Sequence, residues 1–251
     1  MEFKNPTAAD IPQLSALWSE AFGDTDEFIA GFFSTAFAPE RALCAFINDE
    51  LVSALYIFDC SFENEKIAYI YAVATAEKHR GRGFAKELLG YCDEYLKNNG
   101  YKAAVLVPSE DSLFKFYTNL GYEKTVFADK INICSRDMGV NVEKISGFEF
   151  AQLRSVFLPE NSVLQEGASI DYLATYCSFY KGSDFLLAAY KNGDTLYGAE
   201  LLGNRSVAEG IVYTLGCEQG IFKTVGSSTP YALFKPLSEI AVPCYFGLAF
   251  D

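Results

Sequence analysis

The most constraining feature of this chain is a short run rich in glycine and arginine between a strand-like and a helix-like segment. The run reads Arg80-Gly81-Arg82-Gly83-Phe84-Ala85. Apolar residues 67–75 before it predict a strand, and residues 84–99 after it predict a helix. The first backbone N–H groups of a helix lack partners within it and carry partial positive charge. Such a junction therefore favours a bound phosphate group.

The residue types in this run suit a phosphate ligand. Gly81 and Gly83 have no Cβ, so the backbone can approach phosphate oxygens closely. Arg80 and Arg82 supply guanidinium groups that bind phosphate through two hydrogen bonds at once. A Walker loop would need Gly-Lys followed by Ser or Thr, and a dinucleotide fingerprint would need glycine where Lys86 stands. The spacing Arg-x-x-Gly-x-Ala therefore indicates another kind of pyrophosphate site.

A second pattern follows the predicted helix. Small and aliphatic residues 103–107 predict a buried strand, which Pro108 ends. Apolar side chains then recur at helical spacing up to Gly121, which stands where a C-cap glycine would. These side chains belong to Leu113, Phe116, Tyr117 and Leu120.

The two patterns resemble the two motifs of the GNAT superfamily of N-acetyltransferases. The first resembles the acyl-CoA motif Arg/Gln-x-x-Gly-x-Gly/Ala, and residues 71–79 resemble the end of the fourth strand of that family. The second resembles a helix that carries Phe-Tyr, followed three residues later by Gly and an aromatic residue. The matching residues here are Phe116-Tyr117 and Gly121-Tyr122. The resemblance covers residues 1–136 and implies a mixed α/β sheet in the order β-α-α-β-β-β-α-β-α-β-β.

The resemblance also implies a cofactor and the residues that bind it. Acetyl-CoA is the implied acyl donor, and no metal is implied. The pantetheine arm would pair with the end of a splayed strand, and the pyrophosphate would lie on the loop that follows. The implied cofactor-binding residues are Val73, Ala74, Thr75, Arg80, Gly81, Arg82, Gly83, Phe84 and Ala85.

Tyr117 is the catalytic residue that the resemblance implies. In the family this tyrosine protonates the departing CoA thiolate, and a phenol suits that role because its unperturbed pKa lies above that of a thiol. Glu110 departs from the family pattern, which often has Asn there, so one polar contact to CoA is in doubt. The sequence identifies no general base. The candidates are a water chain, Tyr69, Tyr71, Asp59 and Glu20.

Composition narrows the classes of function. The net charge is −13 and both halves are acidic, which disfavours nucleic-acid binding and favours cationic amine acceptors. The single histidine, His79, excludes sites that need two, and we expect it to pack or cap beside the loop. The seven cysteines show no Cys-x-x-Cys pair, which fits reduced thiols in a cytoplasmic protein. The first residues do not resemble a signal peptide, and no apolar run is long enough to span a membrane.

The second half of the chain lacks a phosphate loop. Its pattern predicts helices at 147–157, 169–179 and 206–215, a hairpin of 185–190 with 195–202, and strands at 220–225, 231–234 and 245–250. This order resembles a shortened GNAT domain, as in tandem proteins such as the enhanced-intracellular-survival acetyltransferases. We therefore expect a GNAT domain over 1–136 and a degenerate GNAT-like domain over 137–251, with a sterol-carrier-like domain as the alternative.

The C-terminal residues have two interpretations. We expect 245–250 to form an edge strand. Alternatively, the terminal carboxylate or Asp251 lies near the acceptor site.

The function implied by these features is transfer of an acetyl group from acetyl-CoA to a primary amine of a small molecule or peptide. A non-catalytic acyl-CoA sensor, or an interaction module with a vestigial pocket, is the alternative. The acceptor, the length of the acyl group and the oligomeric state are not indicated by the sequence.

Overall fold

The computed structural model describes residues 1–250, which divide into two compact units. Unit 1 comprises Met1–Glu123 and Leu233–Ala241, whereas unit 2 comprises Lys124–Ala232 and the segment from Val242 onward. Neither unit is a single stretch of sequence, because residues 233–241 belong to unit 1 and the chain from Val242 onward belongs to unit 2. Among residues 1–250, no helix combines the length and the apolar character needed to cross a membrane.

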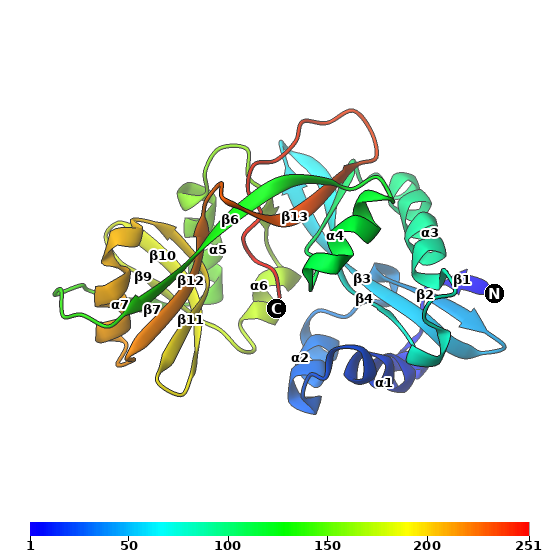
Figure 1. Cartoon of the computed structure of the whole chain (residues 1–251), viewed down its shortest axis with the longest axis horizontal. Helices are drawn as coiled ribbons and strands as arrows, with labels where there is room; N and C mark the ends of the chain where they lie inside the picture. The colour runs from blue at the N-terminus through cyan, green and yellow to red at the C-terminus, as the bar shows by residue number, and fades with distance from the viewer. Residues whose placement is uncertain (251) are drawn as a thin grey trace. The chain divides into compact units, whose positions relative to one another are not determined.

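Unit 1 follows the predicted order of elements as far as its fourth helix (Figure 1). Its elements are β1 (Glu2–Lys4), α1 (Ile11–Phe22), α2 (Asp26–Thr35), β2 (Ala42–Ile47), β3 (Glu50–Phe62), β4 (Glu65–Thr75), α3 (Phe84–Asn98), β5 (Ala103–Leu106) and α4 (Asp111–Thr118), with short 3-10 turns η1 (Ala8–Asp10), η2 (Pro39–Arg41) and η3 (Glu77–His79).

Two tight hairpin turns set the register of the central strands. Asn48 and Asp49 join β2 to β3 with φ of 49° and 65°, and Glu63 and Asn64 join β3 to β4 with φ of 52° and 63°. Two successive residues with positive φ form the turn whose twist matches that of paired strands. These two polar stretches therefore fold as two-residue hairpin loops.

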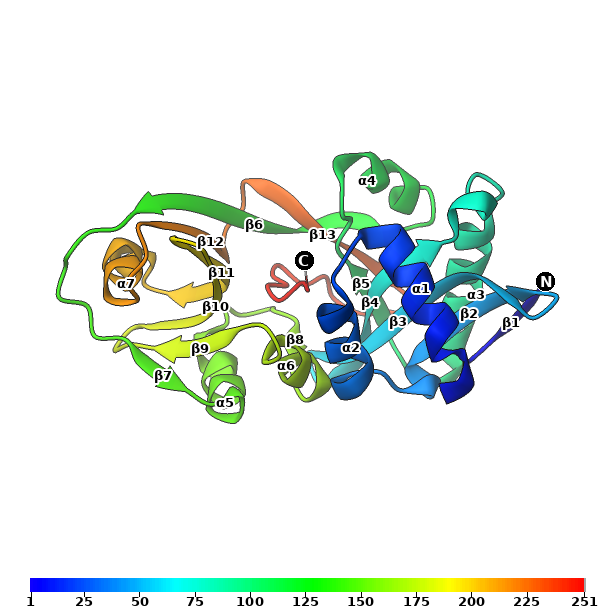
Figure 2. The same cartoon turned by 90° about the horizontal axis from the view of Figure 1, so that it is seen from below.

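Side chains of β3 and β4 alternate between two differently covered faces. Tyr56 and Tyr71 face α1, where both rings contact the buried ring of Trp18, with centroids 5.3 Å and 5.4 Å away. Their neighbours Ile57 and Ile70 face the other way and belong to the core cluster formed with α3 and α4. Figure 2 shows α1 and α3 on the two sides of these strands. The strands read as nearly continuous apolar runs because both faces are covered.

The edge of β5 is closed by a strand from far along the chain. Residues 233–236 of β13 (Thr229–Pro236) pair antiparallel with β5, with Phe234 opposite Val105 and Lys235 opposite Ala104. The strand order in unit 1 is therefore β1-β2-β3-β4-β5-β13. The strand β6 (Glu123–Cys134) follows α4 in sequence but pairs with β12 (Gln219–Val225) of unit 2.

The order implied by the resemblance ends in two strands, which would fall at 125–127 and 131–134, and this expectation is wrong. These residues form the single strand β6, because Ala128, Asp129 and Lys130 between them pair with β12 in unbroken register. A partner strand of this length keeps the polar residues extended.

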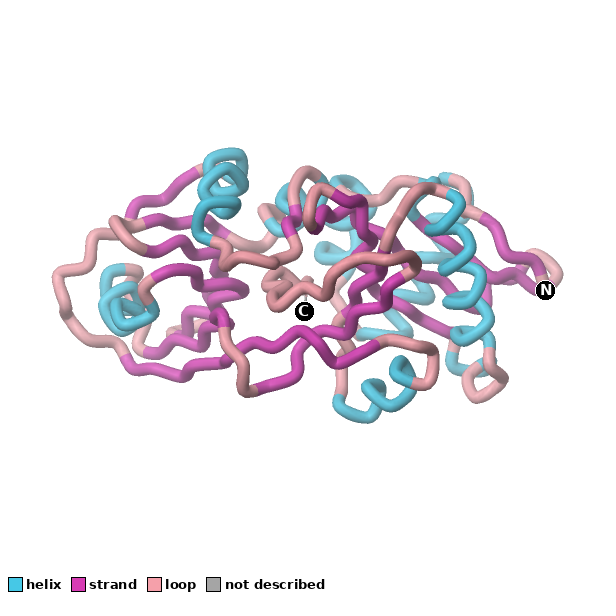
Figure 3. The backbone as a smooth tube through the Cα atoms, turned by 90° about the horizontal axis from the view of Figure 1, so that it is seen from above, coloured by secondary structure: helices cyan, strands magenta, loops and turns pink. Residues whose placement is uncertain are grey.

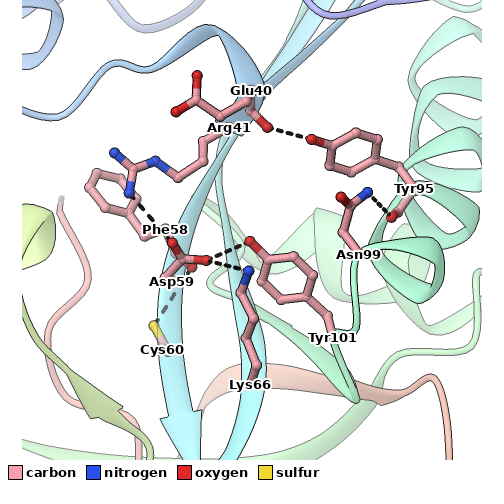
Figure 4. A network of polar contacts seen from close by, with 9 residues as sticks. All are labelled: Glu40, Arg41, Phe58, Asp59, Cys60, Lys66, Tyr95, Asn99 and Tyr101. Atoms are coloured by element: carbon pink, nitrogen blue, oxygen red, sulfur yellow. Dashed lines mark hydrogen bonds and ion pairs between the residues drawn. The ribbon is translucent and has the colours of Figure 1, made fainter.

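A polar network ties together the elements at one end of β3 (Figure 4). The carboxylate of Asp59 accepts a hydrogen bond from the hydroxyl of Tyr101 at 2.5 Å and lies 3.4 Å from both Lys66 and Arg41. The hydrogen bond from Tyr101, together with these two cations, lowers the pKa of Asp59 against the opposing effect of its partial burial. The network joins η2, β3, β4 and the segment that follows α3.

Unit 2 also combines strands and helices. Its remaining elements are β7 (Glu143–Ile145), α5 (Gly147–Phe157), β8 (Leu164–Gln165), α6 (Ala168–Leu173), β9 (Ser178–Lys181), β10 (Phe185–Asn192), β11 (Thr195–Gly203), η4 (Arg205–Val207) and α7 (Ala208–Thr214). The strand order runs β13-β6-β12-β11-β10-β9-β7. Strand β12 is parallel to β11, and α7 connects them.

Two predictions in the second half are wrong. The helix expected over 169–179 ends at Leu173, and Ser178–Lys181 is the strand β9, which pairs with β10. Residues 245–250 form no strand, and Figure 3 shows this segment as loop. Asp251 lies outside the described residues.

The segment 245–250 is nevertheless buried and anchored. The side-chain amide of Gln165 donates to the carbonyl of Leu248 at 2.6 Å and accepts from its N–H at 3.3 Å. The backbone N–H of Val163 donates to the carbonyl of Tyr245 at 2.9 Å. The side-chain amide of Gln165 thus satisfies the backbone groups that a neighbouring strand would otherwise bind. The apolar segment 245–250 is therefore buried although it does not form a strand.

A buried ion pair holds this segment to the sheet. Arg154 of α5 donates from Nε and Nη2 to the two carboxylate oxygens of Glu200 at 2.6 Å and 3.0 Å, and both side chains are fully buried. The hydroxyl of Tyr245 donates to Glu200 at 3.1 Å, and burial raises the pKa of that phenol. Removing one member of a buried pair leaves an uncompensated charge.

We therefore expect Glu200→Ala to destabilise unit 2 by about 3–5 kcal/mol, measured by urea unfolding and by hydrogen exchange of unit 2 amides. Glu209→Ala is the control, because its ion pair with Arg136 is long, at 3.8 Å, and exposed. That variant should cost about 0–1 kcal/mol. Equal losses of unfolding free energy in the two variants would contradict the conclusion that the Arg154–Glu200 ion pair is buried.

Candidate functional site

A cavity of about 700 Å³ lies within unit 1, at the end of β4 and the start of α3. It is lined by Ala21, Phe22, Val73, Ala74, Thr75, His79, Arg80, Gly81, Gly83, Phe84, Ala85, Lys86, Ser109, Glu110, Leu113, Phe116 and Tyr117. Nine of the ten residues that the sequence singled out are in this set, and Arg82 is the exception. The fold thus brings these nine predicted site residues to one cavity, although the first and the last are more than 40 positions apart in sequence.

The cavity exists because two parallel strands diverge. Strand β4 pairs with β5 only from Ile67 to Tyr69, opposite Ala103 to Val105, although β4 continues to Thr75. A bulge lies in the diverging part: β4 has two residues, Ala72 and Val73, where β3 has one, and Ala72 has a φ of 47°. A bulge bends a strand and interrupts its pairing. The end of β4 thereby turns a backbone edge toward the cavity.

The loop after β4 is shaped by two left-handed glycines. Gly81 and Gly83 have φ of 74° and 86°, and Gly83 is the N-cap of α3. A Cβ built on either glycine would meet nothing within 4 Å, so the loop is open on that side. The Nε of Arg80 donates to the carbonyl of Thr75 at 3.1 Å, which ties the loop to the end of β4.

Arg82 does not line the cavity and instead contacts His79, which does. Its Nη1 lies 3.1 Å from Nδ1 of His79, and its guanidinium lies 5.0 Å from the ring centroid of Phe84. A guanidinium only donates, so this contact assigns Nδ1 of His79 as the acceptor. The Nε2 of His79 lies 3.5 Å from the carboxylate of Glu50. The prediction that His79 packs beside the loop is therefore confirmed.

Tyr117 lies on the opposite wall of the cavity, on α4. Its side chain is largely buried and packs against the rings of Phe116 and Tyr122, with centroids 5.1 Å and 5.9 Å away. Burial raises the pKa of Tyr117 to about 12, because an ionised phenol would lose its hydration. The phenol therefore stays protonated at neutral pH and can act as a proton donor.

Several lining residues were not found from the sequence. Phe22, at the end of α1, is 40% exposed and is an aromatic residue that the helix leaves at the cavity wall. Ser109 and Leu113 enter with α4. Helical periodicity alone could not distinguish Phe22 from the core residues of α1.

The side chains that the sequence offered as general bases do not line the cavity. None of the candidates Tyr69, Tyr71, Asp59 and Glu20 lines it. Asp59 is engaged by the network of Figure 4, and a carboxylate oxygen of Glu20 accepts from the backbone N–H of Glu77. Over residues 1–250, no group of three or more His, Cys, Asp or Glu side chains is placed to hold a metal ion.

Comparisons with known proteins agree with this geometry. Residues 2–125 match the family model described as an acetyltransferase (GNAT) domain. No curated protein sequence matches the chain. The resemblance predicted from the two motifs is therefore confirmed for the first half of the chain.

Solved structures with the same fold cover nearly the whole chain. A GCN5-related N-acetyltransferase from Kribbella flavida superposes with a TM-score of 0.70 at 15% identity, over 94% of this chain and 72% of that one. Eis1 from Mycobacterium abscessus gives 0.68 at 12% identity, over 94% and 74%. A putative acetyltransferase from Pyrococcus horikoshii gives 0.63 at 16% identity, over 99% and 94%. The chain therefore shares the fold of these proteins.

The glycine at the helix start offers a test of the loop geometry. Gly83→Ala places a Cβ in a left-handed conformation, so we expect a loss of about 1–2 kcal/mol in unfolding free energy. Gly90→Ala is the matched control, because Gly90 lies inside α3 with nothing within 4 Å of an added Cβ. It should stabilise the protein by about 0.5–1 kcal/mol. Thermal unfolding measures both, and a stabilised Gly83→Ala would refute the loop conformation.

Proposed function

We propose that this chain transfers an acetyl group from acetyl-CoA to a primary amine of a small molecule or a peptide. The proposal starts from the GNAT domain matched over residues 2–125. Its main support is one observation: the end of β4, the loop 80–85 and Tyr117 line the same cavity.

The groups around the cavity fit the parts of an acyl-CoA. Val73, Ala74 and Thr75 would hold the pantetheine arm, because the backbone of β4 has no β5 partner at these positions. The loop residues Arg80 to Ala85 would bind the pyrophosphate through backbone N–H groups at the start of α3 and through Arg80. Arg82 would join them only by leaving His79, so its role as a direct ligand requires a change of rotamer.

The chemistry would need little from the protein beyond positioning and a proton. The amine nitrogen attacks the thioester carbon and loses a proton to water, the C–S bond breaks, and Tyr117 donates its proton to the leaving thiolate. Backbone N–H groups near the bulge at Ala72 would stabilise the developing oxyanion. We assign no side chain as the base, because none of the four side-chain candidates from the sequence lines the cavity. The acidic net charge of −13 favours cationic amines over nucleic acid as partners.

A non-catalytic acyl-CoA sensor or interaction module is the alternative function. It would use the same cavity and loop. A protonated phenol on the cavity wall favours catalysis, since a sensor has no leaving thiolate to protonate.

We further propose that residues 137–251 are a degenerate GNAT-like domain, with the boundary at residue 136 remaining a prediction. The support is a repeated order of elements: β4-η3-α3-β5 in unit 1 and β11-η4-α7-β12 in unit 2, each with parallel outer strands and a bulge in the first strand. In unit 2, η4 runs directly into α7, so the four loop residues 80–83 of unit 1 have no counterpart. This repeat favours the GNAT-like interpretation over a sterol-carrier-like domain.

Arg80→Ala tests the donor site. We expect acetyl-CoA to bind about 10–100-fold more weakly, because charge-assisted hydrogen bonds to phosphate are each worth about 1.5–3 kcal/mol. Calorimetric titration measures the change. Lys97→Ala is the control, because Lys97 pairs with Glu94 near the far end of α3 and should leave the affinity unchanged. The proposal fails if the wild-type protein binds no acetyl-CoA.

Tyr117→Phe tests the acid. We expect acetyl-CoA to bind as before while the rate of acetyl transfer falls by about 100-fold or more. Release of CoA is followed with spermidine, an aminoglycoside and a lysine-containing peptide as acceptors. If wild type and variant both bind CoA but neither acetylates any amine, the sensor interpretation gains support.

A further inference from the structure

Lys235 forms a bridge that no sequence motif points to. It lies in β13, yet its Nζ donates to the carboxylate of Asp93 on α3 at 2.5 Å and to the carbonyl of Leu120 after α4 at 2.6 Å. The side chains of Lys235 and Asp93 are only 19% and 16% exposed. Pairing of Lys235 with Ala104 across the β5–β13 ladder fixes where this side chain starts. A single ammonium group thus joins two helices that both line the candidate site.

The bridge acts on the turn that holds Tyr117. The carbonyl of Tyr117 accepts from the N–H groups of Leu120 and Tyr122, at 2.9 Å and 3.2 Å, so the chain wraps back onto that residue. Lys235 contacts the end of this turn: its Nζ donates to the carbonyl of Leu120 and lies 5.3 Å from the centroid of the Tyr122 ring, and its side chain passes beside Gly121. The Tyr122 ring in turn packs on the Tyr117 ring.

The other end of the bridge is anchored to the loop helix. Asp93 lies on α3, which begins directly after Gly83. The ammonium group of Lys235 therefore connects the helix that starts at the proposed pyrophosphate loop with the helix that carries the proposed acid. Leu233, two residues earlier on the same strand, belongs to the same core cluster as Tyr117 and Tyr122.

We propose that Lys235 is a positioning residue for acyl transfer: through Asp93 and the carbonyl of Leu120 it fixes α4 against α3, and so holds the Tyr117 phenol at the cavity wall. The inference rests on the proposed role of Tyr117 as the acid. The inference also links strand β13 to the site of unit 1. Lys235, which lies on β13, follows Tyr117 by more than 100 positions in sequence.

A purely structural bridge would behave differently from a positioning one. If Lys235 only attached β13 to the unit, its loss would lower stability and the fraction of active protein, but each intact molecule would react at the normal rate. A positioning residue changes the rate of the step in which Tyr117 takes part. Its effect must then vanish when the Tyr117 hydroxyl is already absent.

The test compares Lys235→Met, Tyr117→Phe and the double variant that carries both substitutions. Lys235→Arg is added as the conservative variant. Lys66→Met is the matched control: Lys66 also pairs with an aspartate in unit 1, Asp59, and lies over a tyrosine ring, Tyr101, but it does not touch α4. Each protein is assayed for CoA release with the same three amines, for acetyl-CoA affinity and binding stoichiometry by calorimetry, and for amide hydrogen exchange in residues 111–118.

We expect Lys235→Met to lower kcat about 10–100-fold, the loss that a displacement of about 1 Å causes, with little change in acetyl-CoA affinity or stoichiometry. Lys235→Arg should restore most of the rate, and Lys66→Met should leave it unchanged. In the Tyr117→Phe background, Lys235→Met should cause no further fall. Exchange in residues 111–118 should be faster in Lys235→Met than in Lys66→Met.

Two results would overturn the inference: an equal fall in kcat caused by Lys235→Met with and without the Tyr117 hydroxyl, or unchanged exchange in residues 111–118. Failure of the proposed function looks different, since the wild-type protein would then bind no acetyl-CoA or acetylate no amine. In that case the exchange comparison of Lys235→Met with Lys66→Met still decides whether the bridge positions α4.

Discussion

The divergence of β4 and β5 is the constraint on which the rest of unit 1 depends. Two parallel strands joined by a helix would ordinarily pair along their length, but here pairing stops at Tyr69. Backbone polar groups that lose a strand partner need another one, because leaving them buried and unpaired is costly. The bulge at Ala72, the left-handed glycines of the loop and the entry of α4 from the far side all follow from this opening. The cavity is what remains between them.

The opposite edge of β5 shows how the two parts of the chain depend on each other. A strand of four residues buried between helices needs partners on both sides, and β13 provides the second one. The strand that follows α4 in sequence pairs elsewhere, with β12. Each unit is therefore completed by chain from beyond its main stretch of sequence. Lys235 shows that the returning strand also carries charge to the turn beside Tyr117.

Unit 2 repeats the order of strand, 3-10 turn, helix and parallel strand without the loop that would hold a phosphate. Its interior is instead organised by buried polar groups. Arg154, Glu200 and Gln165 are all fully buried, and they hold the apolar segment that ends the described chain. Buried ionic groups of this kind add little net stability compared with apolar packing, but they are costly to break singly. These buried polar groups hold residues 245–250 in one conformation although the segment does not form a strand.

The local sequence determined much of this protein by itself. The hairpin turns, the alternating faces of β3 and β4, the order of elements up to α4 and the junction at residues 80–85 follow from turn chemistry, periodicity and glycine placement, which act over a few residues. The ten proposed site residues could be named because they belong to two contiguous motifs, and nine of them line one cavity. Tertiary structure alone decided the pairing of β13 with β5, the continuity of β6, the early end of α6, the irregular path of 245–250, and the contributions of Phe22 and Lys235. The physical reason is that each of these depends on a partner distant in sequence: a strand edge, a buried carboxylate or a cavity wall that exists only once the chain has folded.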